Sequence, residues 1–331
     1  RRTFAELQDG LVALLGRIQG APRVEASFLR REFPQGSQEQ FSREILAALG
    51  FDDRRGRLDV SAHPFTTTLG YDDVRITTRY KADLFQTAIF GTIHEAGHAL
   101  YEMGFDETLR GSLLADGTSL GIHESQSRFW ENVVGRSRPF WRRYFPRLQE
   151  LFPGALQGVD RDRFFRGINQ VQPSLIRVEA DEVTYGLHII LRFRLELDLV
   201  SRRLEVSDLP DAWRSVSREL LGIEPESHAE GVLQDIHWSM GAFGYFPTYA
   251  LGNLYAAQFT QALQNDLPNF EGLIEAGNFK PILEWLRMNI HRHGSAKLPT
   301  ELLSDIVGES LAPGAFLDYL EAKYRDVYRL S

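Results

Sequence analysis

The feature that most constrains this chain is a five-residue segment, His94-Glu95-Ala96-Gly97-His98, inside an apolar run from about Asp83 to Met103. Apolar residues recur in this run at helical spacing, which predicts a largely buried helix. Two histidines and a carboxylate on such a helix need polar partners, because burying a polar group without one costs free energy. The chain must therefore fold so that a second segment brings polar groups to this helix.

The spacing of the two histidines favours a metal site. Residues four apart share one face of a helix, with Cβ atoms about 6 Å apart, so both imidazoles can bind one Zn²⁺ at about 2.1 Å. Glu95 can then accept a proton from the attacking water as the general base. The alternative is a pair of ordinary surface or core histidines on an amphipathic helix. The apolar flanking residues Phe90, Ile93 and Leu100 favour the metal site over that alternative.

A third protein ligand is expected from a second helix downstream. The sequence contains no cysteine, so this ligand must be His, Asp or Glu. Glu124 lies 26 residues after His98, where a second helical pattern begins, and it is the preferred ligand. Glu131, seven residues further on and on a similar face, is the alternative, whereas Glu102 is interpreted as a neighbour or a helix-end charge. Two histidines and one glutamate leave one coordination position for water, which is typical of a catalytic zinc site.

Most of the chain has the periodicity of amphipathic helices. The expected helices outside the segments above are 4–18, 41–49, 173–201, 212–221, 228–240, 247–265, 270–293, 299–311 and 313–328. One region differs, because residues 65–69 and 74–80 are rich in β-branched residues and flank the turn residues Gly70-Tyr71-Asp72. This pattern predicts a hairpin directly before the histidine-bearing helix. The fold class is therefore mainly α with a minor sheet.

The composition argues against several classes of partner. The chain has 37 Lys and Arg against 45 Asp and Glu, and this net charge of −8 does not suit a surface that binds nucleic acid or anionic lipid. No apolar run reaches about 18 residues, so no membrane-spanning helix is expected. The first residues lack the apolar stretch of a secretory signal, and a cysteine-free sequence fits a reducing compartment. A cytoplasmic protein with no nucleic-acid or membrane partner is the expectation.

Six segments, in chain order, resemble signatures of the thermostable carboxypeptidase Taq family of zinc metallocarboxypeptidases. They are HPF at 63–65, DVRIT at 73–77, HEAGH at 94–98, HESQ at 123–126, IRVEAD at 176–181 and GVLQDIHW at 231–238. The resemblance covers essentially the whole chain. It implies a helical, saddle-like body with a deep groove, related to neurolysin and angiotensin-converting enzyme, with the small sheet beside the zinc helix. Members of that family carry a further helical region before the matched part. Residues 1–331 are therefore expected to be a single catalytic region corresponding to the C-terminal two thirds.

The resemblance also implies a function. It implies a carboxypeptidase that releases single amino acids from free peptide C-termini with broad specificity, using one Zn²⁺ per chain, or Co²⁺ in its place, in a homodimer. An oligoendopeptidase or a dipeptidyl carboxypeptidase with the same zinc chemistry is the nearest alternative. A catalytically silent binding or dimerisation fragment is an alternative of a different class.

Residues outside the zinc signature are candidates for stabilising the oxyanion. Relatives in the wider clan place a histidine and a tyrosine at a spacing comparable to that of His237 and Tyr249, which are twelve residues apart. Donors beyond the metal are needed because the tetrahedral intermediate carries negative charge. Tyr245, eight residues after His237, competes with Tyr249 for this role.

An exopeptidase also has to bind the terminal carboxylate, for which the forked guanidinium group of arginine is suited. Arg75, Arg79 and Arg177 are the candidates. Each has a structural alternative as the ion-pair partner of a nearby carboxylate, namely Asp73, Asp181 or Glu179. Asp181 and Asp235 are expected to orient ligands or to hold helices together. His63 is either a substrate contact or a structural cap, and the hairpin at 65–80 could pair with the substrate backbone as an added strand.

Overall fold

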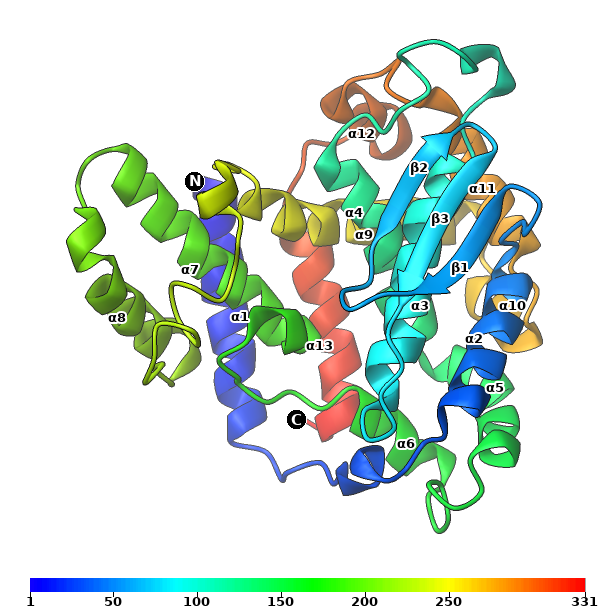
Figure 1. The fold of residues 1–331 in the computed structure, drawn as a ribbon, viewed down its shortest axis with the longest axis horizontal. Helices are drawn as coiled ribbons and strands as arrows, with labels where there is room; N and C mark the ends of the chain where they lie inside the picture. The colour runs from blue at the N-terminus through cyan, green and yellow to red at the C-terminus, as the bar shows by residue number, and fades with distance from the viewer. Residues whose placement is uncertain (331) are drawn as a thin grey trace. The chain divides into compact units, whose positions relative to one another are not determined.

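The computed structural model describes residues 1–330, which form thirteen α-helices and one three-stranded sheet (Figure 1). The prediction of a mainly helical fold with a minor sheet is confirmed. The chain divides into two compact units. The first unit contains residues 1–24, 169–251 and those from 312 onward, and the second contains residues 25–168 and 252–311. None of the described helices is long and apolar enough to cross a membrane.

The second unit is organised around the histidine-bearing helix α3 (Phe85–Glu102). Its other helices are α2 (Gln35–Leu49), α4 (Leu120–Arg128), α5 (Arg138–Leu151), α6 (Arg161–Ile168), α10 (Phe270–Ala276), α11 (Lys280–Asn289), α12 (Pro299–Val307) and most of α9 (Phe246–Asp266). Helix α3 packs against α2, α4, strand β3 and the π-helical turn Phe129–Gly135 that follows α4. Because neighbours surround it, α3 buries residues over most of its circumference, and the stripe that carries His94 and His98 is half-buried.

The sheet lies beside α3 and contains β1 (Gly56–Val60), β2 (Thr66–Gly70) and β3 (Asp73–Thr78), in the order β1-β3-β2. Strands β2 and β3 are antiparallel, which confirms the predicted hairpin, with a register shift between Thr68 and Gly70. Strand β1 runs parallel to β3 and was not predicted. Residues Val74 and Ile76 of β3 are buried against α3, whereas β2 is an edge strand whose last residues are exposed.

The first unit contains α1 (Arg2–Gln19), α7 (Glu182–Val200), α8 (Leu209–Leu221), α13 (Gly314–Tyr328) and the beginning of α9. Helix α1 packs against α7 and α13, and α7 also packs against α8. The contact between α1 and α7 is close at Gly186, where an added Cβ would lie 2.6 Å from Cδ1 of Leu11.

Several predicted helices differ from the structure in extent. The helix expected from Pro173 begins instead at Glu182, because the Asp181 carboxylate accepts hydrogen bonds from the backbone N–H groups of Val183 and Thr184 and so caps α7. The helix expected over 270–293 is broken after α10 at Gly277, which has a left-handed φ of 70°. The helix expected over 299–311 likewise ends at Gly308, with φ of 78°.

The helix expected over 228–240 is wrong. This segment forms turns and a single 3₁₀ turn, Trp238–Met240, followed by Gly241 with a φ of 78°. The Gln234 side chain accepts a hydrogen bond from the Arg177 backbone and donates one to the Leu175 carbonyl. These hydrogen bonds to a distant part of the chain stabilise turns in this segment instead of a helix.

Candidate metal centre

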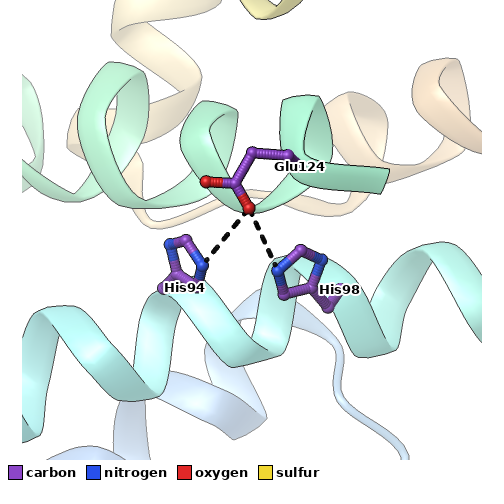
Figure 2. A group of neighbouring side chains, drawn as sticks. All are labelled: His94, His98 and Glu124. Atoms are coloured by element: carbon purple, nitrogen blue, oxygen red, sulfur yellow. Dashed lines mark ion pairs between the residues drawn. The ribbon is translucent and has the colours of Figure 1, made fainter. Parts of the chain in front are cut away.

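Helices α3 and α4 bring the three predicted metal ligands together. Figure 2 shows Glu124 reaching from α4 toward His94 and His98, which share one face of α3. Oε2 of Glu124 lies 3.7 Å from Nε2 of His94 and 3.5 Å from Nε2 of His98. A tetrahedral zinc site with bonds of about 2.1 Å requires ligand atoms about 3.4 Å apart. These three side chains therefore fit a divalent metal ion, and among residues 1–330 they are the ones whose ligand atoms converge in this way.

Two glycines allow α4 to sit close to its neighbours. A Cβ on Gly97 of α3 would lie 2.5 Å from the backbone oxygen of Gln126, and a Cβ on Gly252 of α9 would lie 2.5 Å from Cγ of Glu124. Helix α4 begins at Ser119, whose hydroxyl accepts a hydrogen bond from the Ile122 backbone. The position of Glu124 is thus set by backbone packing from both sides.

The Glu124 carboxylate is held in its charged form. Burial alone would raise its pKa, but the guanidinium of Arg128 and the two histidines outweigh burial and hold the pKa well below its usual range. Nε of Arg128 donates to Oε1 at 2.7 Å. This contact leaves Oε2 directed toward the histidines, as a monodentate metal ligand requires.

Glu131, the alternative third ligand, binds the opposite side of His94. Its Oε2 lies 2.9 Å from Nδ1 of His94, and Arg136 donates to its Oε1 at 3.1 Å. Because a carboxylate only accepts, the neutral form of His94 donates from Nδ1 and keeps a lone pair on Nε2, which faces Glu124. Burial works to lower the pKa of His94, but the carboxylates of Glu124 and Glu131 outweigh it and raise that pKa.

His98 has a different partner. Its Nδ1 lies 2.6 Å from Nδ1 of His123, whose Nε2 lies 2.7 Å from Oε1 of Glu102. Burial lowers the pKa of His98 to about 3, so the imidazole is neutral and available as a ligand at neutral pH. This arrangement was not predicted from the sequence, although Glu102 stands four residues after His98 and His123 directly precedes Glu124.

Glu95, the predicted general base, is buried on α3 next to the face that carries His94 and His98. Glu95 is 7% exposed, and its Oε2 accepts a hydrogen bond of 2.6 Å from the Thr66 hydroxyl on edge strand β2. Burial raises the pKa of Glu95, opposed by His94 and by the Thr66 hydrogen bond. A carboxylate with a raised pKa is a stronger base than an exposed one, which suits proton transfer near neutral pH.

In the first unit, the structure pairs His237 with Tyr249. Nε2 of His237 lies 3.1 Å from the Tyr249 hydroxyl, while the ring of Tyr245 packs 5.2 Å from the His237 ring. Burial, followed by the charge of Arg177, lowers the pKa of His237. Nε2 of a neutral His237 can therefore accept a hydrogen bond from the Tyr249 hydroxyl or, in the other tautomer, donate one to it.

The three candidate arginines have different environments. Arg75 is exposed and pairs with Asp73 at 2.8 Å, the partner named in its structural alternative. Arg79 donates to the Ala62 carbonyl, and His63, which follows Ala62 in the sequence, is exposed.

Arg177 is buried, and its expected partners were wrong. It pairs with Asp235 at 2.7 Å rather than with Asp181 or Glu179, because Asp181 is used as the cap of α7. Asp235 also binds the fully buried Arg192 at 2.6 Å. One carboxylate is thus shared by two guanidinium groups, next to Tyr249, whose ring centroid is 5.1 Å from the Arg177 guanidinium.

The chain resembles characterised carboxypeptidases along its whole length. It is 51% identical over 326 residues to thermostable carboxypeptidase 1 of Thermus thermophilus and 48% identical over 328 residues to carboxypeptidase 1 of Bacillus subtilis, which covers 98% and 99% of this chain. It spans 64% and 66% of the lengths of these relatives.

The fold of this chain is also similar to solved structures of carboxypeptidases. The crystal structure of the M32 carboxypeptidase from Deinococcus radiodurans matches with a TM-score of 0.97 at 44% identity, covering 99% of this chain and 66% of that one. The metallocarboxypeptidase 1 of Trypanosoma cruzi matches with a TM-score of 0.92 at 38% identity, covering 98% of this chain and 66% of that one. The family model for carboxypeptidase Taq (M32) metallopeptidases matches residues 1–324. A chain with this match and with a triad on α3 and α4 that fits a metal ion belongs to the carboxypeptidase Taq (M32) metallopeptidase family.

Proposed function

We propose that this chain carries the catalytic region of a metal-dependent carboxypeptidase that removes single amino acids from free peptide C-termini with broad specificity. The observation that carries the proposal is the triad of His94, His98 and Glu124, next to a buried glutamate with a raised pKa. The names of the relatives, each a carboxypeptidase, favour an exopeptidase over other uses of the same triad.

The ligand chemistry favours Zn²⁺, or Co²⁺ in its place, with one ion per chain. Two imidazoles and a carboxylate are a ligand set of catalytic zinc sites. When bound, such an ion would supply Lewis-acid polarisation of the attacking water and of the scissile carbonyl. Glu124 contributes the negative charge, and Arg128 binds its second oxygen so that this charge is directed to one side.

Glu95 acts as the general base in the proposed mechanism. Its carboxylate accepts a proton from the attacking water and later gives that proton to the leaving amine. The Thr66 hydroxyl binds Oε2 and fixes the orientation of the carboxylate. Thr66 belongs to edge strand β2. A substrate backbone that paired with β2 would therefore lie beside the strand that orients Glu95.

His237 and Tyr249 are proposed to donate hydrogen bonds to the oxyanion of the tetrahedral intermediate. Their mutual contact of 3.1 Å supports a shared role, and Tyr245 is the proposed neighbour that packs on both rings. Donors fixed in advance stabilise developing charge without reorganising during the reaction.

Arg177 is the strongest of the three arginine candidates for the terminal carboxylate of the substrate. Arg75 is exposed and already paired one-to-one with Asp73, and the half-buried Arg79 donates to the Ala62 carbonyl. Arg177 and Arg192 together carry two positive charges against the single charge of Asp235. This surplus favours an anion, because a buried charge needs a partner.

The family resemblance further favours a cytoplasmic homodimer in which residues 1–331 form one catalytic region. Light scattering of the purified chain tests the dimer, with twice the chain mass of 37.8 kDa expected.

Time-resolved mass spectrometry of one peptide, with either a free or an amidated C-terminus, tests the proposal. The free peptide should shorten by one residue at a time from its C-terminus, and amidation should suppress this. Internal cleavage of both peptides at similar rates would instead support an oligoendopeptidase. Removal of two residues at a time would support a dipeptidyl carboxypeptidase, and no cleavage by the zinc-loaded chain would support a silent fragment.

A further inference from the structure

We propose that Glu102 and His123 are positioning residues that select the tautomer of His98 and thereby present its Nε2 lone pair to the metal ion. This inference rests on the proposed metal site, and it concerns two side chains to which the proposed mechanism gives no role. Both belong to the same unit as the triad.

The three side chains form an unbranched chain of contacts. Nδ1 of His98 lies 2.6 Å from Nδ1 of His123, and Nε2 of His123 lies 2.7 Å from Oε1 of Glu102. The contacts join the end of α3 to the first turn of α4, because Glu102 is the last residue of α3 and His123 the fourth of α4. Glu102 is 8% exposed, so its carboxylate is largely removed from water.

Only one proton arrangement satisfies all of these contacts with both rings neutral. A carboxylate can only accept, so Nε2 of His123 must carry the proton that faces Glu102. Nδ1 of His123 then has a lone pair and must accept, which places the proton of His98 on its Nδ1. Nε2 of His98 is left with a lone pair, and this atom is the one that faces Oε2 of Glu124 at 3.5 Å.

The opposite arrangement is disfavoured at both ends. If Nδ1 of His123 donated to His98, the His123 Nε2 lone pair would face the Glu102 carboxylate. The proton of His98 would then sit on Nε2, where the metal ion has to bind. The charge of Glu102 therefore determines the tautomer of a metal ligand two residues away in the hydrogen-bond chain.

Packing keeps the His123 ring in the required orientation. The ring of Tyr101 lies edge-on to it with centroids 5.1 Å apart. Gly117 also approaches this ring so closely that a Cβ there would lie 2.9 Å from Cδ2 of His123. His94 needs no intermediate histidine, because the Glu131 carboxylate contacts its Nδ1 directly.

Competition titration of the metal-free protein with Zn²⁺ and a chelator of known affinity tests the proposal. His123→Phe keeps a planar ring but removes the acceptor, and it should weaken Zn²⁺ binding by about 10–100-fold. His123→Asn, which offers an amide oxygen near the position of Nδ1, should lose less affinity than His123→Phe. Glu102→Gln should shift affinity in the same direction and by less, because the amide can accept but no longer selects one tautomer.

Two further measurements separate positioning from a merely structural role. The melting temperature of each metal-free variant reports packing, and a structural role would lower it while leaving Zn²⁺ affinity unchanged. In the Co²⁺-loaded protein, the ligand-imidazole N–H protons are shifted out of the main NMR spectrum. The His98 signal should exchange rapidly with water in His123→Phe and remain protected in His123→Asn. His293→Phe, a change of the same kind outside this chain of contacts, should alter neither affinity nor this signal.

The outcomes also separate this inference from the proposed function. Failure of the unaltered chain to bind Zn²⁺ would reject the metal site itself. If the unaltered chain binds Zn²⁺ tightly, and His123→Phe has the same Zn²⁺ affinity and the same protection of the His98 N–H, only the positioning role of Glu102 and His123 is overturned.

Discussion

Two buried polar clusters, one in each unit, use the same kinds of side chain to opposite effect. In the second unit, the Glu124 carboxylate has one oxygen bound by Arg128 and the other facing the Nε2 atoms of His94 and His98. In the first unit, the Asp235 carboxylate is shared by two arginines. The first arrangement leaves electron pairs converging on one point, which suits a cation. The second leaves surplus positive charge, which suits an anion. A peptidase that acts at a free C-terminus needs one site of each kind.

The largest effect is expected from a change of Glu95, which should strongly slow peptide hydrolysis without loss of Zn²⁺ binding. Glu95→Gln keeps the shape of the side chain but removes the base, so kcat/KM should fall by about 10²–10⁴-fold. Zn²⁺ content after dialysis should stay at the wild-type value, because Glu95 is not one of the three ligands. Retention of more than about a tenth of wild-type kcat/KM would show that Glu95 is not the base.

Glu124→Ala should act on the metal rather than on the chemistry. It removes one of three protein ligands, so Zn²⁺ affinity should fall by at least the roughly 10–100-fold typical of changes to the partners of ligands. Glu131→Ala removes only the partner of His94 and should cost less. Chelator competition on the two purified variants measures both values. A greater loss in Glu131→Ala than in Glu124→Ala would reverse the assignment.

The anion-binding half of the comparison is tested by a ratio of rates. If Arg177 binds the terminal carboxylate as proposed, amidating the peptide C-terminus removes the partner of this buried cation in the unaltered chain. A loss of about 3 kcal/mol would lower kcat/KM by roughly a hundredfold. In Arg177→Gln, the ratio of kcat/KM for the free peptide to kcat/KM for the amidated peptide should fall toward one. This ratio does not depend on the fraction of the protein that is folded.

Arg75→Gln is the matched control for that ratio. Arg75 is exposed and paired with Asp73, so its substitution should preserve the discrimination of the unaltered chain. If discrimination disappeared in Arg75→Gln and persisted in Arg177→Gln, the carboxylate site would have to be moved from the first unit to the sheet.

The smallest expected effect concerns the packing that positions Glu124. Gly252→Ala introduces a Cβ 2.5 Å from Cγ of Glu124 and should destabilise the protein by about 1–3 kcal/mol through overpacking. It should also weaken Zn²⁺ binding, because Glu124 must move. Gly16→Ala on α1, where an added Cβ meets nothing within 4 Å, should instead stabilise by about 0.5–1 kcal/mol. Chemical denaturation of both variants provides the comparison, and a stabilised Gly252→Ala would contradict this account of α4.

The sequence was informative where local spacing determines structure. The positions of His94 and His98 on one face follow from helical periodicity alone, and Glu124 follows from the start of the next helical pattern. Contacts between distant segments could not be predicted in this way. Strand β1 is short, buries only Leu58 and pairs with β3, from which β2 separates it in the sequence, so it has little local signal.

The region 228–240 shows the same limit from the opposite direction. Its periodicity favours a helix, but in the structure Gln234 and Asp235 bind the backbone and side chain of Arg177. Partners 57 and 58 residues away in sequence therefore decide the local structure. For the same reason, the partner of Arg177 was assigned to its near neighbours Asp181 and Glu179 rather than to Asp235.

Titration of the metal-free chain with Zn²⁺, while its C-terminal trimming of an unmodified peptide is followed by mass spectrometry, tests the central claim most directly. The rate of single-residue release should rise linearly with added Zn²⁺ and reach a plateau at one ion per chain, since one triad holds one ion. The same titration of Glu124→Ala should show no plateau at that ratio. Equal trimming by the metal-free and zinc-loaded chains, or a plateau at a different ratio, would contradict a single catalytic metal ion at His94, His98 and Glu124.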